Sequence, residues 1–366
     1  MFLAWRDLRV ARGRFVLVGV VIGLVALLTT LLSGLATGLV DDGISGLRDL
    51  PLTHLALQPG AEHSFSRSSL DDAARQAWAE AEGVQSSPLG VSFFNATDAE
   101  GDTVDLALFG VPADSFLVER ADARAALSDP AGVVLSDEFR DTGIEVGDTL
   151  TVVGPDQQVT VRGFTYAGSY GHVPIAFTSL ETWQQLVYGD NARGRFSAIA
   201  VAPTEGSELD AGAMGRIDDA AGTELETKEQ AFLGSPGFAA ETTTMSLIRG
   251  FLLVISALIV GAFFTVWTVQ RTRQIGLMKA LGASNGYVLR DALGQLAVVL
   301  VAATALGAAV AVGLGSLVGS DVPFSLEPAS VVGSAAVLVL LGMAGSLVAI
   351  RRVTSVDPVI ALGAES

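Results

Sequence analysis

The sequence predicts a membrane α-helical protein with four transmembrane helices in a one-plus-three arrangement and a large extracytoplasmic α+β domain between the first and second helices. Two observations carry this prediction: four long apolar segments, and an uneven distribution of charge. Half of the 366 residues are hydrophobic and only 17% are charged, with a mean hydropathy of +0.50. Such a composition is typical of membrane proteins.

Each of the four apolar segments is long enough to cross a bilayer, which needs about 20 mostly apolar residues. The first, Phe15–Leu39, exceeds the roughly 7–15 apolar residues of a signal peptide, so we expect an uncleaved anchor. The predicted organisation is a cytoplasmic amphipathic helix at 1–14, spans at 15–40, 242–270, 292–320 and 329–350, an outer domain at 41–241, a cytoplasmic coupling loop at 271–291, an outer loop at 321–328 and a cytoplasmic tail at 351–366.

Positive charge sets the orientation, because cytoplasmic loops are enriched in Lys and Arg. The segments before the first span, between the second and third spans, and after the fourth span together hold ten Lys/Arg and four acidic residues. The rest of the chain holds 12 basic and 35 acidic residues. We therefore expect a multi-pass protein of the plasma membrane with both termini in the cytoplasm.

The composition also excludes several functions. The formal charge of −17 argues against nucleic-acid binding, which requires a basic surface. The absence of cysteine excludes disulfides, thiolate metal sites and cysteine nucleophiles. Neither Lys228 nor Lys279 stands in the G-x-x-x-x-G-K-[ST] motif of a P-loop. We therefore expect no enzymatic activity in this chain, and no ATP hydrolysis.

The segment between the first and second spans mixes helix and strand signals, which predicts an α+β domain. Ser69 opens an acidic and then alanine-rich run that predicts a capped helix, and Thr178 with Glu181 forms a T-x-x-E capping box. Strands are expected at 89–94 and 103–109, at 149–153 and 158–164, and at 196–201.

No catalytic site is predicted in this domain. The three histidines, His54, His63 and His172, are scattered and lack the spacing of a metal site. His172 lies in a predicted loop and His63 in a Ser-rich linker, so both are expected to be incidental surface residues. The many carboxylates are expected to form a solvated face.

The cytoplasmic loop contains the run RTRQIGLMKALGAS at 271–284. Ile275, Met278 and Leu281 recur at helical spacing, which predicts a short amphipathic helix flanked by bases and ended by Gly282. Such a helix can dock in a groove on a soluble partner. The alternative is a helix that lies on the lipid surface, with its bases against anionic headgroups.

This run resembles the loop signature of the FtsX/MacB-type (type VII) ABC transporter permeases, commonly R-x-x-E-I-G-[LI]-x-[RK]-A-[LI]-G-A, with Gln274 in place of the usual acid. Ala4–Leu8 resembles the amphipathic start of that family. Residues 133–137 with 147–150 resemble its outer-domain segment VLS…VGDTL, and 357–362 resemble its closing P-x-x-A-L. The one-plus-three arrangement of spans also matches.

The resemblance implies a homodimeric permease that binds two copies of a cytoplasmic ABC ATPase, which would bind the ATP. It implies mechanotransmission, in which closure of the ATPases moves the helices and the outer domain without a continuous pore. The residues that would contact the ATPase are Ile275, Gly276, Met278, Lys279 and Leu281. Within the family, the compact outer domain most resembles the haem-regulated exporter permeases of Gram-positive bacteria, which implies haem as substrate and no intrinsic cofactor.

Glu241, Met245 and Arg249 follow one another at i, i+4 and i+8, on one stripe of the helix that enters the second span. An amphiphile in the outer leaflet would lodge at this depth. The Met245 sulfur or the Glu241 carboxylate could ligate haem iron, and Arg249 could pair with a propionate. The structural alternative is that Arg249 reaches the headgroups, Glu241 pairs along the helix and Met245 fills a gap.

Small residues in the first span, Ser33, Gly34, Ala36 and Gly38, predict close packing at a dimer contact or binding groove, or within the chain. Two rival functions stay open. One is an exporter of the same mechanism that acts on lipids, lipoproteins or peptide antibiotics. The other is a non-transporting regulator of a cell-wall hydrolase, which would need a protein-binding outer surface instead of a small-molecule site.

Overall fold

The computed structural model describes residues 12–354 apart from 119, 130, 193, 205, 208, 209, 271–276, 278–281, 320 and 321. The chain divides into two compact units, which we call the membrane unit (Met1–Gly38 and Thr242–Ser366) and the outer domain (Leu39–Glu241). The predicted amphipathic helix at 1–14 lies almost wholly outside the described residues.

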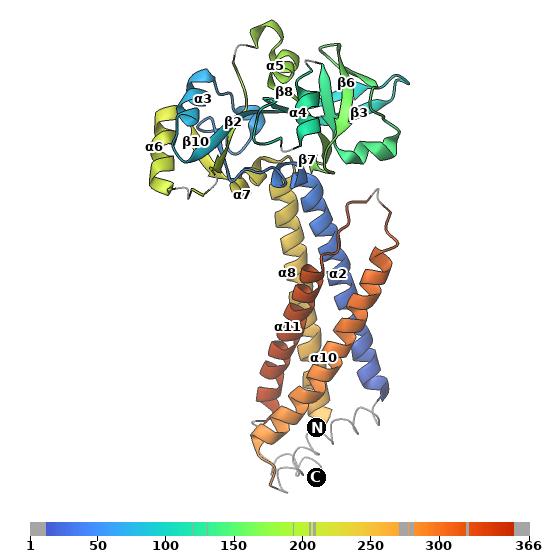
Figure 1. Ribbon diagram of the computed structural model, residues 1–366. Coiled ribbons are helices and arrows are strands. Elements are labelled where there is room, and N and C mark those ends of the chain that lie inside the picture. Colours follow the sequence, from blue (N-terminus) through green and yellow to red (C-terminus); the bar gives the residue numbers. More distant parts are fainter. Residues whose placement is uncertain are drawn as a thin grey trace. The chain divides into compact units, whose positions relative to one another are not determined.

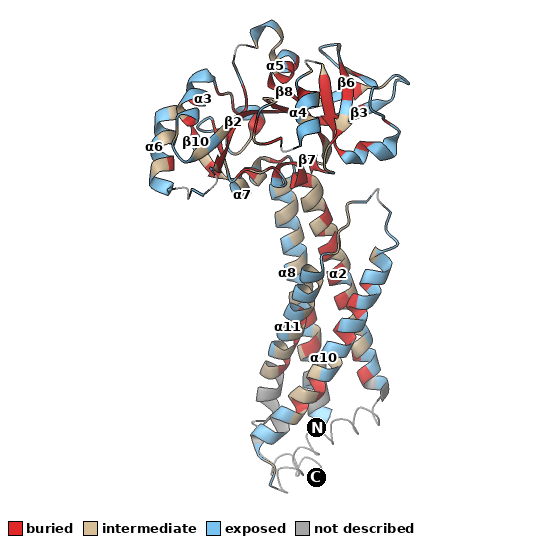
Figure 2. Cartoon of the chain, in the orientation of Figure 1, coloured by how far each residue is buried: buried red, intermediate tan, exposed pale blue. Residues whose placement is uncertain are grey.

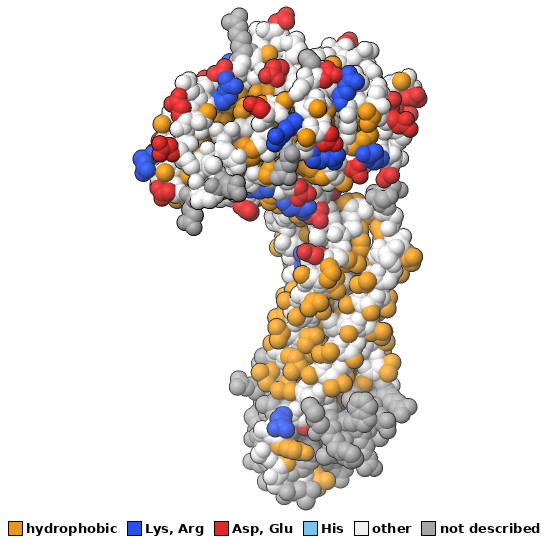
Figure 3. Space-filling model, viewed as in Figure 1, with side chains coloured by type: hydrophobic (Ala, Val, Ile, Leu, Met, Phe, Trp, Pro, Cys, Tyr) orange, Lys and Arg blue, Asp and Glu red, His pale blue; other side chains and the backbone are white. Residues whose placement is uncertain are grey.

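Among the described residues, four helices are long and apolar enough to span a bilayer, which confirms the predicted one-plus-three fold (Figure 1). They are α2 (Arg12–Arg48), α8 (Phe238–Gln270), α10 (Asn285–Gly315) and α11 (Pro328–Thr354). The helix α2 continues past the predicted end of its span and enters the outer domain. Figure 3 shows hydrophobic side chains over the visible face of the spanning helices.

Glycines let the membrane helices cross closely. A Cβ atom at Gly307 of α10 would overlap the carbonyl oxygen of Gly23 on α2, and one at Gly345 of α11 would lie 2.9 Å from the carbonyl oxygen of Ala257 on α8. Small residues favour helix association in lipid because they let backbones approach. The buried apolar side chains of this bundle include Ile22, Val260, Leu296, Leu300 and Leu338.

The described part of the outer domain contains a ten-stranded sheet with the order β10-β1-β9-β2-β3-β8-β4-β6-β5, and β7 pairs with β8. The strands are β1 (His54–Leu57), β2 (Val84–Thr97), β3 (Thr103–Val111), β4 (Gly132–Leu135), β5 (Thr149–Val152), β6 (Gln157–Phe164), β7 (Ser169–Tyr170), β8 (Val173–Ser179), β9 (Ala198–Pro203) and β10 (Glu224–Thr227). Its helices are α3 (Asp72–Ala79), α4 (Ala121–Leu127), α5 (Leu180–Tyr188), α6 (Ala211–Ala221) and α7 (Lys228–Ala231), with short 3₁₀ turns between elements.

The long strand β2 belongs to two parts of this sheet. Its first half, Val84–Leu89, pairs with β9, and its second half, Gly90–Thr97, pairs with β3. Ala96 and Thr97 also pair with β5. The strands β2, β3, β8, β4, β6 and β5 therefore close into a ring, while β9, β1 and β10 extend from it.

The predicted strand pairs β2–β3 and β5–β6 are confirmed as antiparallel neighbours. The two predicted N-cap residues, Ser69 and Thr178, are both wrong. The cap of α3 is Asp71, whose carboxylate accepts hydrogen bonds from two backbone N–H groups. The cap of α5 is Ser179, whose hydroxyl accepts from the N–H of Thr182 at 3.0 Å. Thr178 cannot cap the helix because it is a strand residue paired between β3 and β4.

Alternate side chains of the strands enter two hydrophobic cores. On β3, Leu106 and Leu108 belong to one core, whereas Ala107 and Phe109 belong to the other. Since successive side chains of a strand point to opposite faces, the two cores lie on opposite faces of the sheet. Figure 2 shows the strands as the most continuously buried part of this domain. Burial on both faces explains why these strands are apolar along most of their length.

Trp183 of α5, which belongs to the same core as Leu106 and Leu108, packs directly on two glycines. Gly90 of β2 and Gly110 of β3 are paired neighbours, and a Cβ atom on either would overlap Trp183. The Trp183 side chain is buried, with 1% of its surface exposed, so it cannot withdraw without opening the core. The absence of side chains at both positions is therefore a packing requirement.

We expect Gly110→Ala to lower the free energy of unfolding by about 1–3 kcal/mol, the usual cost of overpacking a core. Gly163→Ala on β6 is the matched control, because nothing lies within 4 Å of a Cβ atom there. Denaturant unfolding of the full chain, followed by tryptophan fluorescence, measures both changes. Equal stability of the two variants would contradict this packing requirement.

Candidate functional site

The outer domain holds the last turns of α2 through close backbone contacts. A Cβ atom at Gly46 would overlap the side chain of Ile175, so the glycine lets α2 approach β8. The Tyr166 hydroxyl donates to the Gly46 carbonyl at 2.8 Å. The Ser235 hydroxyl donates to the Gly43 carbonyl at 2.7 Å. The end of α2 is thus fixed to segments far away in the sequence.

His172 lies beside this helix end, in the two-residue turn of the β7–β8 hairpin. Gly171 and His172 have φ angles of 60° and 62°, which are typical of a type I′ turn. The Nδ1 atom of His172 lies 2.8 Å from Asp42 Oδ2 on α2, and Nε2 lies 3.0 Å from Glu241 Oε1 on α8. The prediction that His172 is incidental is wrong, because the hairpin folds it onto both helix ends.

A third carboxylate completes what we call the junction cluster: Asp42, Glu138, His172 and Glu241. Burial lowers the pKa of His172, but its hydrogen bonds to Asp42 and Glu241 outweigh burial and raise that pKa above its usual value. Glu138 accepts a hydrogen bond from the Ser169 hydroxyl at 3.2 Å. Burial raises the pKa of Glu138, against the hydrogen bond from Ser169, and the charge of Asp42 adds to the increase. The surroundings of His172 and Glu138 therefore favour the protonated form of each.

His63 is also paired, contrary to the prediction. Its Nδ1 lies 2.8 Å from Oε1 of Glu226, a carboxylate that is 6% exposed. Sequence spacing could not reveal this pair, because its members are 163 residues apart. In the part of the chain that the structure describes, no group of three or more His, Cys, Asp and Glu could hold a metal ion.

Glu241, Met245 and Arg249 all lie on the continuous helix α8. Glu241 is engaged by His172, and Met245 is half-buried. The Nη2 atom of Arg249 donates to the carbonyl oxygen of Ser33 on α2 at 3.0 Å. Its Nε atom is buried and has no hydrogen-bond partner among the described residues. Among the three predicted binding residues, Arg249 thus has a buried N–H donor with no partner among the described residues.

The small residues of the first span pack within the chain. A Cβ atom at Gly34 would lie 2.7 Å from the ring of Phe324, and one at Gly38 would overlap the carbonyl of Pro323. The Ser325 N–H donates to the Gly34 carbonyl at 3.0 Å. These contacts favour the intrachain alternative, and the packing partner of Gly34 and Gly38 is the loop between α10 and α11.

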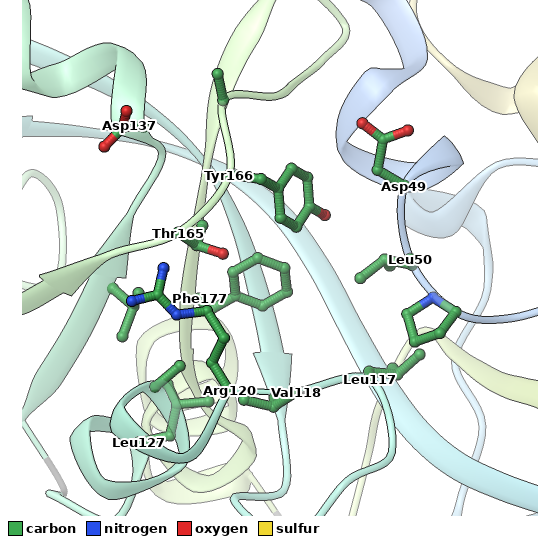
Figure 4. A pocket seen from close by; sticks show the side chains of 14 residues that line it. Asp49, Leu50, Leu117, Val118, Arg120, Leu127, Asp137, Thr165, Tyr166 and Phe177 are labelled. Atoms are coloured by element: carbon green, nitrogen blue, oxygen red, sulfur yellow. The ribbon is translucent and has the colours of Figure 1, made fainter.

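A pocket of about 340 Å³ opens in the outer domain, beside the residues that follow α2 (Figure 4). Its three charged residues are already paired, Asp49 with Arg48, Arg120 with Asp122, and Asp137 with Arg140. The hydroxyl of Tyr166 donates its hydrogen bond to the Gly46 carbonyl of α2. The apolar lining consists mainly of Leu50, Leu117, Val118, Leu127, Val134 and Phe177. This pocket is suited to an apolar group rather than to recognition of a charged one.

The predicted ATPase-coupling residues lie outside the described residues: Ile275, Gly276, Met278, Lys279 and Leu281. Leu277, within the same segment, is helical and 58% exposed. Gly282 has a φ angle of 98°, the left-handed conformation expected of a residue that ends a helix. The helix α10 then starts after Ser284, whose hydroxyl accepts from the N–H of Tyr287.

Comparisons with known proteins match both parts of the chain. Residues 246–358 match the family model of the FtsX-like permease C-terminal region, and residues 15–215 match that of the MacB-like periplasmic core domain. A putative hemin transport system permease protein of Staphylococcus haemolyticus is 22% identical over 99% of each chain. An uncharacterized ABC transporter permease of Mycobacterium tuberculosis is 25% identical over 58% of each chain. The periplasmic region of MacB from Actinobacillus actinomycetemcomitans gives a TM-score of 0.38 at 12% identity, covering 51% of this chain and 94% of that one.

We expect Gly46→Ala to lower the free energy of unfolding by about 1–3 kcal/mol, because the added methyl group overlaps Ile175. Gly215→Ala in α6 is the matched control, since nothing lies within 4 Å of its Cβ atom. Replacing glycine by alanine in an open helix position should raise stability by up to about 1 kcal/mol. Thermal unfolding of the full chain in lipid nanodiscs compares them, and a stabilising Gly46→Ala would show that α2 does not approach β8 closely.

Proposed function

Because the chain belongs to the family of FtsX-like and MacB-like ABC transporter permeases, we propose that it is the membrane subunit of an ATP-driven exporter whose cargo is haem. A relative named for hemin transport matches along 99% of each chain, which supports the choice of cargo. The observation that carries the proposal within this chain is the buried N–H donor of Arg249, which has no hydrogen-bond partner among the described residues. In this proposal the permease is a homodimer with both termini in the cytoplasm.

A separate ATPase would supply the energy, since this chain has no P-loop motif. Two helices, α2 and α8, connect the outer domain to the spans. Asp42 on α2 and Glu241 on α8 meet at His172, which heads the strand β8. A displacement of either helix would therefore reach the centre of the sheet through the hairpin. This connection is suited to mechanotransmission, in which the outer domain moves with the helices.

Arg249 is the residue best suited to recognise an anionic amphiphile. A cation inside a membrane-spanning helix is costly, so the presence of Arg249 there favours a functional role. A buried donor without a partner is also unfavourable, and a carboxylate would satisfy it with a charge-assisted hydrogen bond. Haem carries two propionates, and a thioether can ligate its iron. We assign Arg249 to a propionate and Met245 to the iron. Glu241 could ligate the iron only if its hydrogen bond to His172 broke.

Arg249→Gln should weaken binding of haem at least about tenfold, because it removes a charge-assisted contact worth roughly 1.5–3 kcal/mol. Arg249→Gln should weaken binding of metal-free protoporphyrin by the same factor, since protoporphyrin keeps both propionates. Met245→Leu should weaken binding of haem but not of protoporphyrin, because protoporphyrin has no iron to ligate. Absorbance in the Soret region, titrated with the permease in nanodiscs, measures each affinity.

Arg290→Gln is the matched control, because Arg290 is an exposed arginine on α10. It should leave both affinities unchanged. If Arg249→Gln behaves like Arg290→Gln, the assignment of Arg249 is wrong. Haem stimulation of the assembled ATPase complex tests the cargo separately. Stimulation by lipids or peptides but not by haem would favour the rival exporter, and no stimulation by any of them would favour the regulator.

Met278→Asp should abolish co-purification of the cognate ATPase, because it places a charge on the apolar stripe proposed to enter the ATPase groove. Leu277→Asp is the matched control, since Leu277 is exposed and is not one of the three residues of that stripe. Pull-down from detergent extracts measures both. If both variants retain the ATPase, the loop does not dock through this stripe, and the lipid-surface alternative gains support.

A further inference from the structure

Both ring nitrogens of His172 face carboxylate oxygens. Nδ1 lies 2.8 Å from Asp42, and Nε2 lies 3.0 and 3.2 Å from the two oxygens of Glu241. A neutral imidazole has one N–H donor and one lone pair, whereas the imidazolium has two donors. An ionised carboxylate can only accept. Full pairing at both nitrogens therefore requires the protonated ring, because otherwise one carboxylate faces a lone pair.

We propose that His172 is a proton-binding latch that fastens the ends of α2 and α8 to the outer domain and tightens on acidification. Asp42 and Glu241 are the charged groups that contact the ring. Glu138 reaches the same corner through Ser169, and Asp41, which precedes Asp42 on α2, pairs with Arg48. The latch needs neither haem nor an ATPase, so it stands apart from the proposed cargo.

The direction of the effect follows from the charges. The two carboxylates hold the pKa of His172 above its usual value, despite the opposing effect of burial. A group with a raised pKa in the folded state stabilises the fold fully below its unfolded pKa of about 6.5. That stabilisation is lost as the pH rises through the raised folded value. The latch is therefore closed in acid and weakened in alkali.

The position of His172 allows one bound proton to affect several chain segments. His172 is 130 residues from Asp42 and 69 residues from Glu241, so one ring joins three separate chain segments. The hairpin turn fixes its position, because consecutive left-handed residues leave the backbone little freedom. Its side chain is 29% exposed, so protons from solvent can reach it. A change of protonation would alter the connection between both helices and β8 at one point.

The test is histidine titration by solid-state NMR, with ¹⁵N-histidine in the full chain in nanodiscs. The three histidines are assigned with His54→Asn and His63→Asn. We expect His172 to carry protons on both nitrogens at pH 6 and to titrate above His54, whose pKa is lowered by burial. Asp42→Asn should shift the His172 titration downward. A neutral His172 at pH 6, or a titration at or below that of His54, overturns the proposal.

A second measurement tests the proposal without assignment of NMR signals. Asparagine tolerates a positive φ, so His172→Asn removes the charge without imposing a new backbone conformation. The thermal midpoint of the wild type should exceed that of His172→Asn by several degrees at pH 5.5, with the gap closing toward pH 8.5. His54→Asn is the matched control and should show no such widening in acid. A gap that is constant with pH, or that widens in alkali, would refute the latch.

Discussion

The structure depends on the contacts that hold the ends of α2 and α8 within the outer domain. A membrane-spanning helix satisfies its own backbone hydrogen bonds, so α2 can remain rigid as it passes from the span into the outer domain. The domain meets that rigid end with hydrogen bonds from Tyr166 and Ser235, and with close packing on Gly46. At the same corner the junction cluster adds Glu241 of α8. Within the outer domain, the ends of both helices are therefore held by a few polar contacts and by this glycine packing.

Much of the fold could be predicted because its signals are local. The spans follow from runs of apolar residues, and the strand pairs β2–β3 and β5–β6 follow from alternation across polar turns. The cap of α5 could not be placed from local sequence, because pairing with two neighbouring strands keeps Thr178 extended. The closure of β2 onto β5 also has no local signal, since it joins residues more than 50 positions apart.

The candidate site was predicted in part for the same reason. Helical spacing places Glu241, Met245 and Arg249 on one stripe of α8. It could not show that Glu241 is paired, because its partner His172 comes from a distant hairpin. Nor could it show that Arg249 donates to the backbone of Ser33 on another helix. The Gly-His dipeptide before β8 was a weak signal of a tight turn, and it gave no indication of which elements that turn would meet.

The closed ring of strands leaves β10 as an outer edge of the sheet. An exposed edge offers unpaired N–H and C=O groups to any neighbouring chain, and many such proteins share one membrane surface. Here the edge strand carries two acids, Glu224 and Glu226, and Glu226 is turned inward onto His63. A buried charge on an edge strand makes pairing with another sheet unfavourable. This short acidic strand thus protects the domain against edge-to-edge aggregation.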